Sequence, residues 1–72
     1  MKNNPRSVSD FLATMPRNES WESAQFRVAV AWDAVRGLYP TMSHFHYVEV
    51  ENYFRAAQQH RDLLESQSIL KT

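Results

Sequence analysis

Three histidines are the residues most able to hold a transition metal, because neutral imidazole is the commonest protein ligand for such ions. His44 and His46 are two residues apart, and His60 follows fourteen residues later. On a helix, a separation of two residues turns two side chains about 200° apart, so His44 and His46 would face opposite sides. His46 and Glu49 share a face at i, i+3, but the sequence has no His-Glu-x-x-His or Glu-x-x-His motif. We therefore expect capping or core histidines, with no bound metal and no other cofactor.

Serine could act as a nucleophile, but this chemistry needs a positioned base and a pocket of roughly 300 Å³ or more. A chain of 72 residues built from short helices rarely encloses such a pocket. The serines stand at expected helix starts (Ser7, Ser20 and Ser43) or late in the chain (Ser66 and Ser68), where capping explains the first three. The single glycine excludes a glycine-rich phosphate loop. We expect a protein that is not an enzyme.

Nucleic-acid binding depends on basic residues, and here eight basic and eight acidic residues give a formal net charge of zero. No overall field therefore attracts the chain to a phosphate backbone. The turn glycine of a helix-turn-helix would be Gly37. Asp33, Ser43 and His46 then occupy the positions where that motif needs one small and two buried aliphatic residues, so the motif fails. The alternative function is a dimeric nucleic-acid regulator that uses the basic stretch from Lys2 to Arg17 as an arm.

Helix signals divide the chain into three segments. Ser7 and Asp10 have the spacing of a capping box, which predicts a short first helix ending before Pro16. Ser20 is the next N-cap candidate, and the single glycine is a natural left-handed stop. A second helix is therefore expected over about residues 21–36, followed by a short connector and a third segment capped by Thr41 or Ser43.

Residues 44–50 at the start of the third segment are rich in aromatic and β-branched residues, which are typical of strands. A helix is favoured because positions from there onward recur at three- and four-residue spacings and a lone strand would have no partner. These positions are Tyr47, Val50, Phe54, Ala57, Arg61 and Leu64. Opposite charges at Glu51 and Arg55, and at Arg61 and Glu65, are expected to form helical pairs. A strand over 44–50 stays the alternative.

The predicted second helix is apolar around most of its circumference. Its main core face is expected to contain Trp21, Ala24, Val28, Ala31, Trp32 and Val35. Phe26, Val30 and Ala34 form a second apolar strip well away from this face. Either the first helix covers Phe26 and Val30 or a second chain does. We favour a second chain, because the first helix is too short to cover the whole strip.

Aromatic residues are numerous for so small a core, and aromatic side chains dominate the energetics of protein interfaces. We expect Trp32 and Phe54 to fill the core. The candidate residues for a partner or self-interface are Phe26, Val30, Phe45, Tyr53, Asp62 and Glu65. The first four are apolar or aromatic and lie beside the predicted core faces, whereas the two acidic residues suit a basic partner surface.

These features predict an all-α fold, in which a short N-terminal helix precedes an antiparallel two-helix hairpin. The chain is expected to form one domain over residues 1–72, with a flexible start (1–6) and a frayed end (69–72). So small a domain buries only about 60% of its unfolded surface. With no cysteine for disulfides, we expect oligomerisation, as a dimer, to complete it.

The expected function is binding to a protein partner. We expect a small accessory protein, such as phages and plasmids carry, that acts as an adaptor or inhibitor of a larger complex. A purely structural subunit is a further alternative. Because the sequence has no signal peptide and no run near the about 18 apolar residues of a membrane span, we expect it in the cytoplasm and off membranes.

Overall fold

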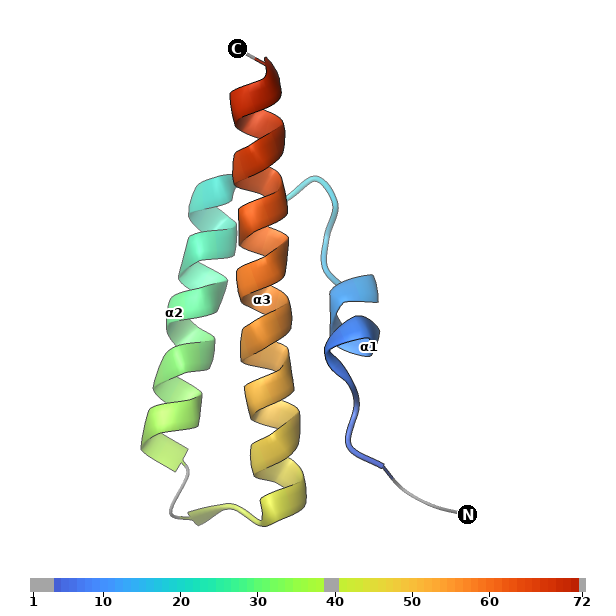
Figure 1. Ribbon diagram of the computed structural model, residues 1–72. Coiled ribbons are helices and arrows are strands. Elements are labelled where there is room, and N and C mark those ends of the chain that lie inside the picture. The colour runs from blue at the N-terminus through green and yellow to red at the C-terminus, as the bar shows by residue number, and fades with distance from the viewer. Residues whose placement is uncertain (1–3, 39–40, 72) are drawn as a thin grey trace.

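A computed structural model describes residues 4–38 and 41–71, with side chains described for 4–37 and 41–67 (Figure 1). It contains helices α1 (Val8–Ala13), α2 (Trp21–Leu38) and α3 (His44–Lys71). The described ranges contain no strand, so the all-α prediction is confirmed and residues 44–50 are helical. The flexibility expected for 1–6 and the fraying expected for 69–72 stay predictions, and residues 39–40 of the connector lie outside the described part.

The three helices lie side by side in a single layer, with α3 in the middle (Figure 1). Helices α2 and α3 form the predicted antiparallel hairpin, and α1 packs mainly against α3 rather than α2. The Cα atoms span 45 × 29 × 13 Å, so the molecule is about one helix thick. Among the described residues, no second layer of secondary structure therefore covers either broad face of this layer.

Serine caps fix the starts of the helices as predicted. Ser7 Oγ accepts a hydrogen bond from the Asp10 amide at 3.2 Å, and the Asp10 carboxylate accepts one from the Ser7 amide at 3.1 Å. Ser20 and Ser43 cap α2 and α3, each accepting a bond from the amide three residues later at 3.1 and 3.3 Å. These bonds satisfy amides that have no partner within the helix.

Gly37 does not end α2, contrary to the prediction of a stop after Arg36. The helix continues through Gly37 to Leu38, and no described residue has a positive φ. A Cβ added at Gly37 would meet nothing within 4 Å. Glycine can adopt the left-handed conformation but is not forced into it, so here it continues the right-handed helix.

The core is built from small residues, and the two tryptophans are not part of it. The buried apolar residues are Met15, Ala24, Val28, Ala31, Val35, Ala56 and Ala57. No large described side chain is fully buried, and Trp21 and Trp32 are 39% and 47% exposed. The prediction that both tryptophans, and Trp32 in particular, fill the core is therefore wrong. The buried apolar residues of α2 and α3 are all alanines and valines, and the larger side chains beside them extend partly into solvent.

The predicted helical pair of Arg61 and Glu65 is also replaced by other contacts. Arg61 Nη1 donates to Gln25 Oε1 of α2 at 2.8 Å, and its Nη2 pairs with Asp62 at 3.2 Å. Glu65 accepts a hydrogen bond from Trp21 Nε1 at 3.2 Å. An exposed i, i+4 pair contributes only about 0.2–0.5 kcal/mol, so partners on α2 displace it readily.

Candidate protein-binding surfaces

A polar cluster joins the start of α2 to α3. Its centre is Glu19, whose side chain is only 7% exposed although it lies in the segment between α1 and α2. Arg27 Nε and Nη2 donate to its two carboxylate oxygens at 3.2 and 2.9 Å, and Ser23 Oγ donates at 2.7 Å. His60 Nε2 lies 2.9 Å from Glu19 Oε1, and Arg27 Nη1 donates to the Tyr53 hydroxyl at 2.7 Å. We call these five residues the Glu19 cluster.

These bonds stabilise the charged forms of Glu19 and Arg27. The Arg27 guanidinium, with help from Ser23 and His60, lowers the pKa of Glu19 to about 2 against the opposing effect of burial. In turn, Glu19 and Tyr53 raise the pKa of Arg27 above its ordinary value. An ionised carboxylate only accepts hydrogen bonds, so the His60 Nε2 carries a hydrogen. His60 is thus a buried core residue, and the cluster holds the helices together.

The other two histidines lie at the start of α3. His46 Nδ1 is 3.0 Å from the hydroxyl of the capping residue Ser43, so His46 takes part in the N-cap. His44 is exposed. Within the described ranges, no three side chains of the His, Cys, Asp and Glu types gather as potential metal ligands.

A second polar contact holds the segment before α1 against α3. The Arg6 amide and Nε donate to Glu49 Oε2 at 3.0 and 3.3 Å, and Asn52 Nδ2 donates to the Arg6 carbonyl at 2.8 Å. The two bonds from Arg6, the one from its backbone amide first, lower the pKa of Glu49. The Arg6 guanidinium also lies over the Phe11 ring, 5.1 Å from its centroid. One cation of the expected basic arm is therefore paired with a carboxylate of the same chain.

Between these two polar contacts lies an apolar groove, with α3 as its floor and α1 and α2 as its walls. It consists of two adjoining hollows of about 240 and 310 Å³, which share Val30 and Tyr53. Its apolar lining comprises Phe11, Phe26, Val30, Ala31, Ala34, Val50 and Tyr53. We call it the α1–α2 groove.

Three of the predicted interface residues meet in the α1–α2 groove. Phe26 and Val30 are 70% and 51% exposed on α2, so α1 does not cover them. Tyr53 is half-buried and meets the Phe11 ring edge to face, with centroids 5.4 Å apart. The structure does not bring the other three predicted residues to this groove. Phe45 is half-buried beside His46 at the start of α3. Asp62 and Glu65 are exposed further along α3.

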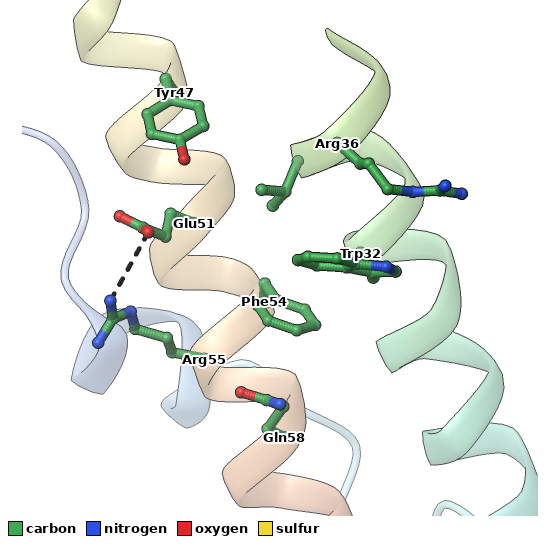
Figure 2. A pocket seen from close by; sticks show the side chains of 8 residues that line it. Trp32, Arg36, Tyr47, Glu51, Phe54, Arg55 and Gln58 are labelled. Carbon is green, nitrogen blue, oxygen red and sulfur yellow. Dashed lines mark ion pairs between the residues drawn. The ribbon is translucent and has the colours of Figure 1, made fainter. Parts of the chain in front are cut away.

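A second surface, which sequence analysis missed, lies between α2 and α3 around Trp32 (Figure 2). The Trp32 and Phe54 rings face each other across the two helices, with centroids 5.4 Å apart and planes tilted by 36°. They line a shallow hollow of about 590 Å³, which we call the Trp32 basin. Its remaining lining residues are Val35, Arg36, Tyr47, Glu51, Arg55 and Gln58.

The Trp32 basin and the α1–α2 groove lie on different sides of α2, because Trp32 is about 200° from Val30 around the helix. Arg36 and Arg55 stand beside the basin with side chains 64% and 61% exposed. Arg55 forms the predicted pair with Glu51 at 3.6 Å (Figure 2). The sequence contains one signal that could have indicated this surface: Trp32 and Arg36 are four residues apart and therefore lie on one side of α2.

Over residues 4–38 and 41–71, the helices, caps and core define a small all-α protein of three helices in one layer. None of its helices in the described ranges is long and apolar enough to cross a membrane. The sequence matches no protein-family model, and neither the curated proteins nor the solved structures include a significant match.

Proposed function

We propose that this is a small non-catalytic protein-binding protein, an adaptor or inhibitor that occupies a surface on a larger protein. The observation that carries the proposal is the exposure of Trp32, at 47%, in an apolar hollow beside Arg36 and Arg55. Tryptophan and arginine are the residues most enriched among interface hot spots. A partner that covered this half-exposed indole would bury further apolar surface, which favours binding.

The basin suits a partner segment that carries an apolar anchor with carboxylates beside it. Trp32 and Phe54 offer the apolar contact, and the guanidinium groups of Arg36 and Arg55 suit bidentate bonds to carboxylates. Arg36 pairs with the exposed Asp33, and the exposed Arg55 pairs with the half-buried Glu51 at 3.6 Å. Ion pairs that are open to solvent contribute little, so carboxylates of a partner can replace these pairs. Because the basin lies between two antiparallel helices, an amphipathic helix is the partner geometry that suits it.

The same proposal includes dimerisation and a cytoplasmic location. The exposed Phe26 and Val30 support a dimer, because contiguous apolar surface on a small domain is typical of an interface. The absence of cysteine from the sequence agrees with a reducing compartment.

Affinity capture with matched variants tests this function. Wild type, Trp32→Ala and Leu63→Ala are immobilised, and proteins retained from a native lysate are quantified by mass spectrometry. Leu63 is the control, because it is an exposed apolar residue of α3 that does not line the Trp32 basin. A genuine partner is retained by wild type and Leu63→Ala and depleted by Trp32→Ala. Titration of the purified partner should then show at least about a tenfold loss of affinity for Trp32→Ala. If no retained protein distinguishes the two variants, the proposed function is wrong.

A further inference from the structure

We infer that the outer side of α2 is a self-interface, in which α2 of a second copy packs antiparallel to it across a two-fold axis near Val30. This interface involves Phe26 and Val30 and leaves Trp32 and Phe54 of the basin on another side of the helix, whereas Arg36, which lines the basin, lies at the edge of both surfaces. The inference therefore adds to the proposed function, of which the dimer is one part, by giving that dimer its contact surface, orientation and register.

The shape of the molecule supports a second copy. Protein domains are built from at least two packed layers, whereas this chain forms one layer 13 Å thick in Cα positions. Its radius of gyration, 13.5 Å, exceeds the roughly 11 Å expected for this chain length. Its surface of 5467 Å² is about 800 Å² above the value that size scaling gives for a monomer of this mass. The segment before α1 and the single layer both contribute to this excess.

An excess of this size matches what a dimer needs, because each partner in a standard interface buries about 800 Å². A second copy of α2 on this side would also cover Phe26 and Val30, which form the α2 wall of the α1–α2 groove.

The position of the interface follows from the pattern of α2. Five residues at three- and four-residue spacings form one strip along the outer side of α2: Ser23, Phe26, Val30, Ala34 and Gly37. Phe26 and Val30 are its large apolar members, at 70% and 51% exposed. The small residues at the other positions allow two helix backbones to approach closely. A two-fold axis at Val30 places Phe26 opposite Ala34 of the second copy, so that a large side chain meets a small one.

The orientation follows from the charges at the two ends of α2. Glu22 is exposed in the first turn and forms no ion pair within the described part of the chain. Arg36 is exposed in the last turn, where its pair with Asp33 is exposed to water as well. A parallel arrangement would bring like charges together at both ends. An antiparallel one pairs Glu22 with Arg36 of the second copy twice, and it also opposes the two helix dipoles.

Disulfide trapping tests the arrangement, because the sequence has no cysteine and each introduced thiol is the only one present. Val30→Cys should form a disulfide-linked dimer with itself under mild oxidation at low micromolar concentration. Ser23→Cys alone and Gly37→Cys alone should not, because the two-fold axis places each pair of identical positions about 21 Å apart along the helix. Mixing these two variants should give the linked heterodimer. Asp62→Cys, exposed on α3, is the control and should stay unlinked.

Light scattering after size exclusion supplies the independent measurement. Wild type should have twice the 8.5-kDa chain mass at tens of micromolar, and Phe26→Asp should have the single mass with unchanged helical circular dichroism. A wild type that stays monomeric overturns the inference. The inference is also overturned if Ser23→Cys forms a disulfide with itself as readily as with Gly37→Cys, because self-linking at position 23 indicates that the two α2 helices pack in parallel. If the wild type is monomeric but affinity capture finds a partner that Trp32→Ala loses, the dimer is wrong and the proposed function stands. If the dimer is trapped but no such partner is captured, the proposed function is wrong and the dimer stands.

Discussion

The Glu19 carboxylate oxygen Oε1 lies 2.9 Å from Nε2 of His60, although the two residues are 41 positions apart in the chain. Both side chains are less than a tenth exposed. Since Glu19 immediately precedes the cap of α2 and His60 lies in the middle of α3, their contact fixes where α2 starts along α3.

Replacing Glu19 by alanine should destabilise the protein more than removing any exposed acid. The change leaves the Arg27 guanidinium and the His60 imidazole without their shared acceptor in a mostly buried place, which should cost about 2–3 kcal/mol. Urea unfolding followed by circular dichroism measures the difference. Asp62→Ala is the control, because its exposed pair with Arg61 should contribute less than about 0.5 kcal/mol. Equal costs for the two variants would mean that the Glu19 cluster adds nothing to stability.

Acid should weaken the protein partly through Glu19. The pKa of Glu19 is about 2 in the folded protein against an ordinary value of 4.5, so below pH 4.5 the unfolded state binds more protons than the folded one. The contribution of Glu19 to the free energy of unfolding is therefore complete above pH 4.5 and falls as the pH drops towards 2. Urea titrations between pH 6 and pH 2 should show the stability of wild type and Glu19→Gln converging on acidification. A constant difference would contradict the low pKa.

Trp32→Ala should cost less stability than truncating a truly buried side chain. Trp32 already exposes almost half of its surface, so we expect a loss of about 1–2 kcal/mol rather than the 3–5 kcal/mol typical of a core aromatic residue. Met15→Ala is the comparison, because Met15 is 6% exposed and its truncation should cost about 2–4 kcal/mol. A larger loss for Trp32→Ala than for Met15→Ala in denaturant unfolding would place Trp32 in the core after all.

Gly37→Ala should stabilise the protein. Gly37 has a right-handed helical backbone with open space around an added Cβ, so alanine should gain about 0.5–1 kcal/mol from its higher helix propensity. Thermal and urea unfolding with circular dichroism both report the change. A destabilised variant would support the left-handed stop that the sequence suggested.

Local signals predicted the starts of the helices and their helical type, but not the end of α2. The bonds of Ser7 with Asp10, and the caps at Ser20 and Ser43, depend on residues three positions apart, so a short stretch of sequence contains everything that forms them. The strip of Phe26 and Val30 was also predictable, because a helix with apolar residues on two sides cannot bury both in a three-helix chain.

Contacts between distant segments could not be predicted in the same way. Trp32 shares the core-facing side of α2 with Val28 and Val35, yet it is 47% exposed whereas both valines are buried, and only the packing of α2 against α3 decides this difference. One part of the Glu19 cluster is visible in the sequence, because Glu19, Ser23 and Arg27 follow one another at four-residue spacing, which is the spacing of residues on one side of a helix. Nothing in that spacing indicates that Tyr53 and His60 would complete the cluster from α3.

The docking of α1 onto α3 has a consequence for local opening. A helix of six residues cannot persist alone in water, and its anchors, Arg6 to Glu49 and Glu19 to His60, close loops of 43 and 41 residues. We therefore expect helix α1 to open as a separate cooperative unit before the hairpin of α2 and α3. Its amides should exchange with deuterium sooner than those in the middle of α3, and each opening exposes Met15 to proteases.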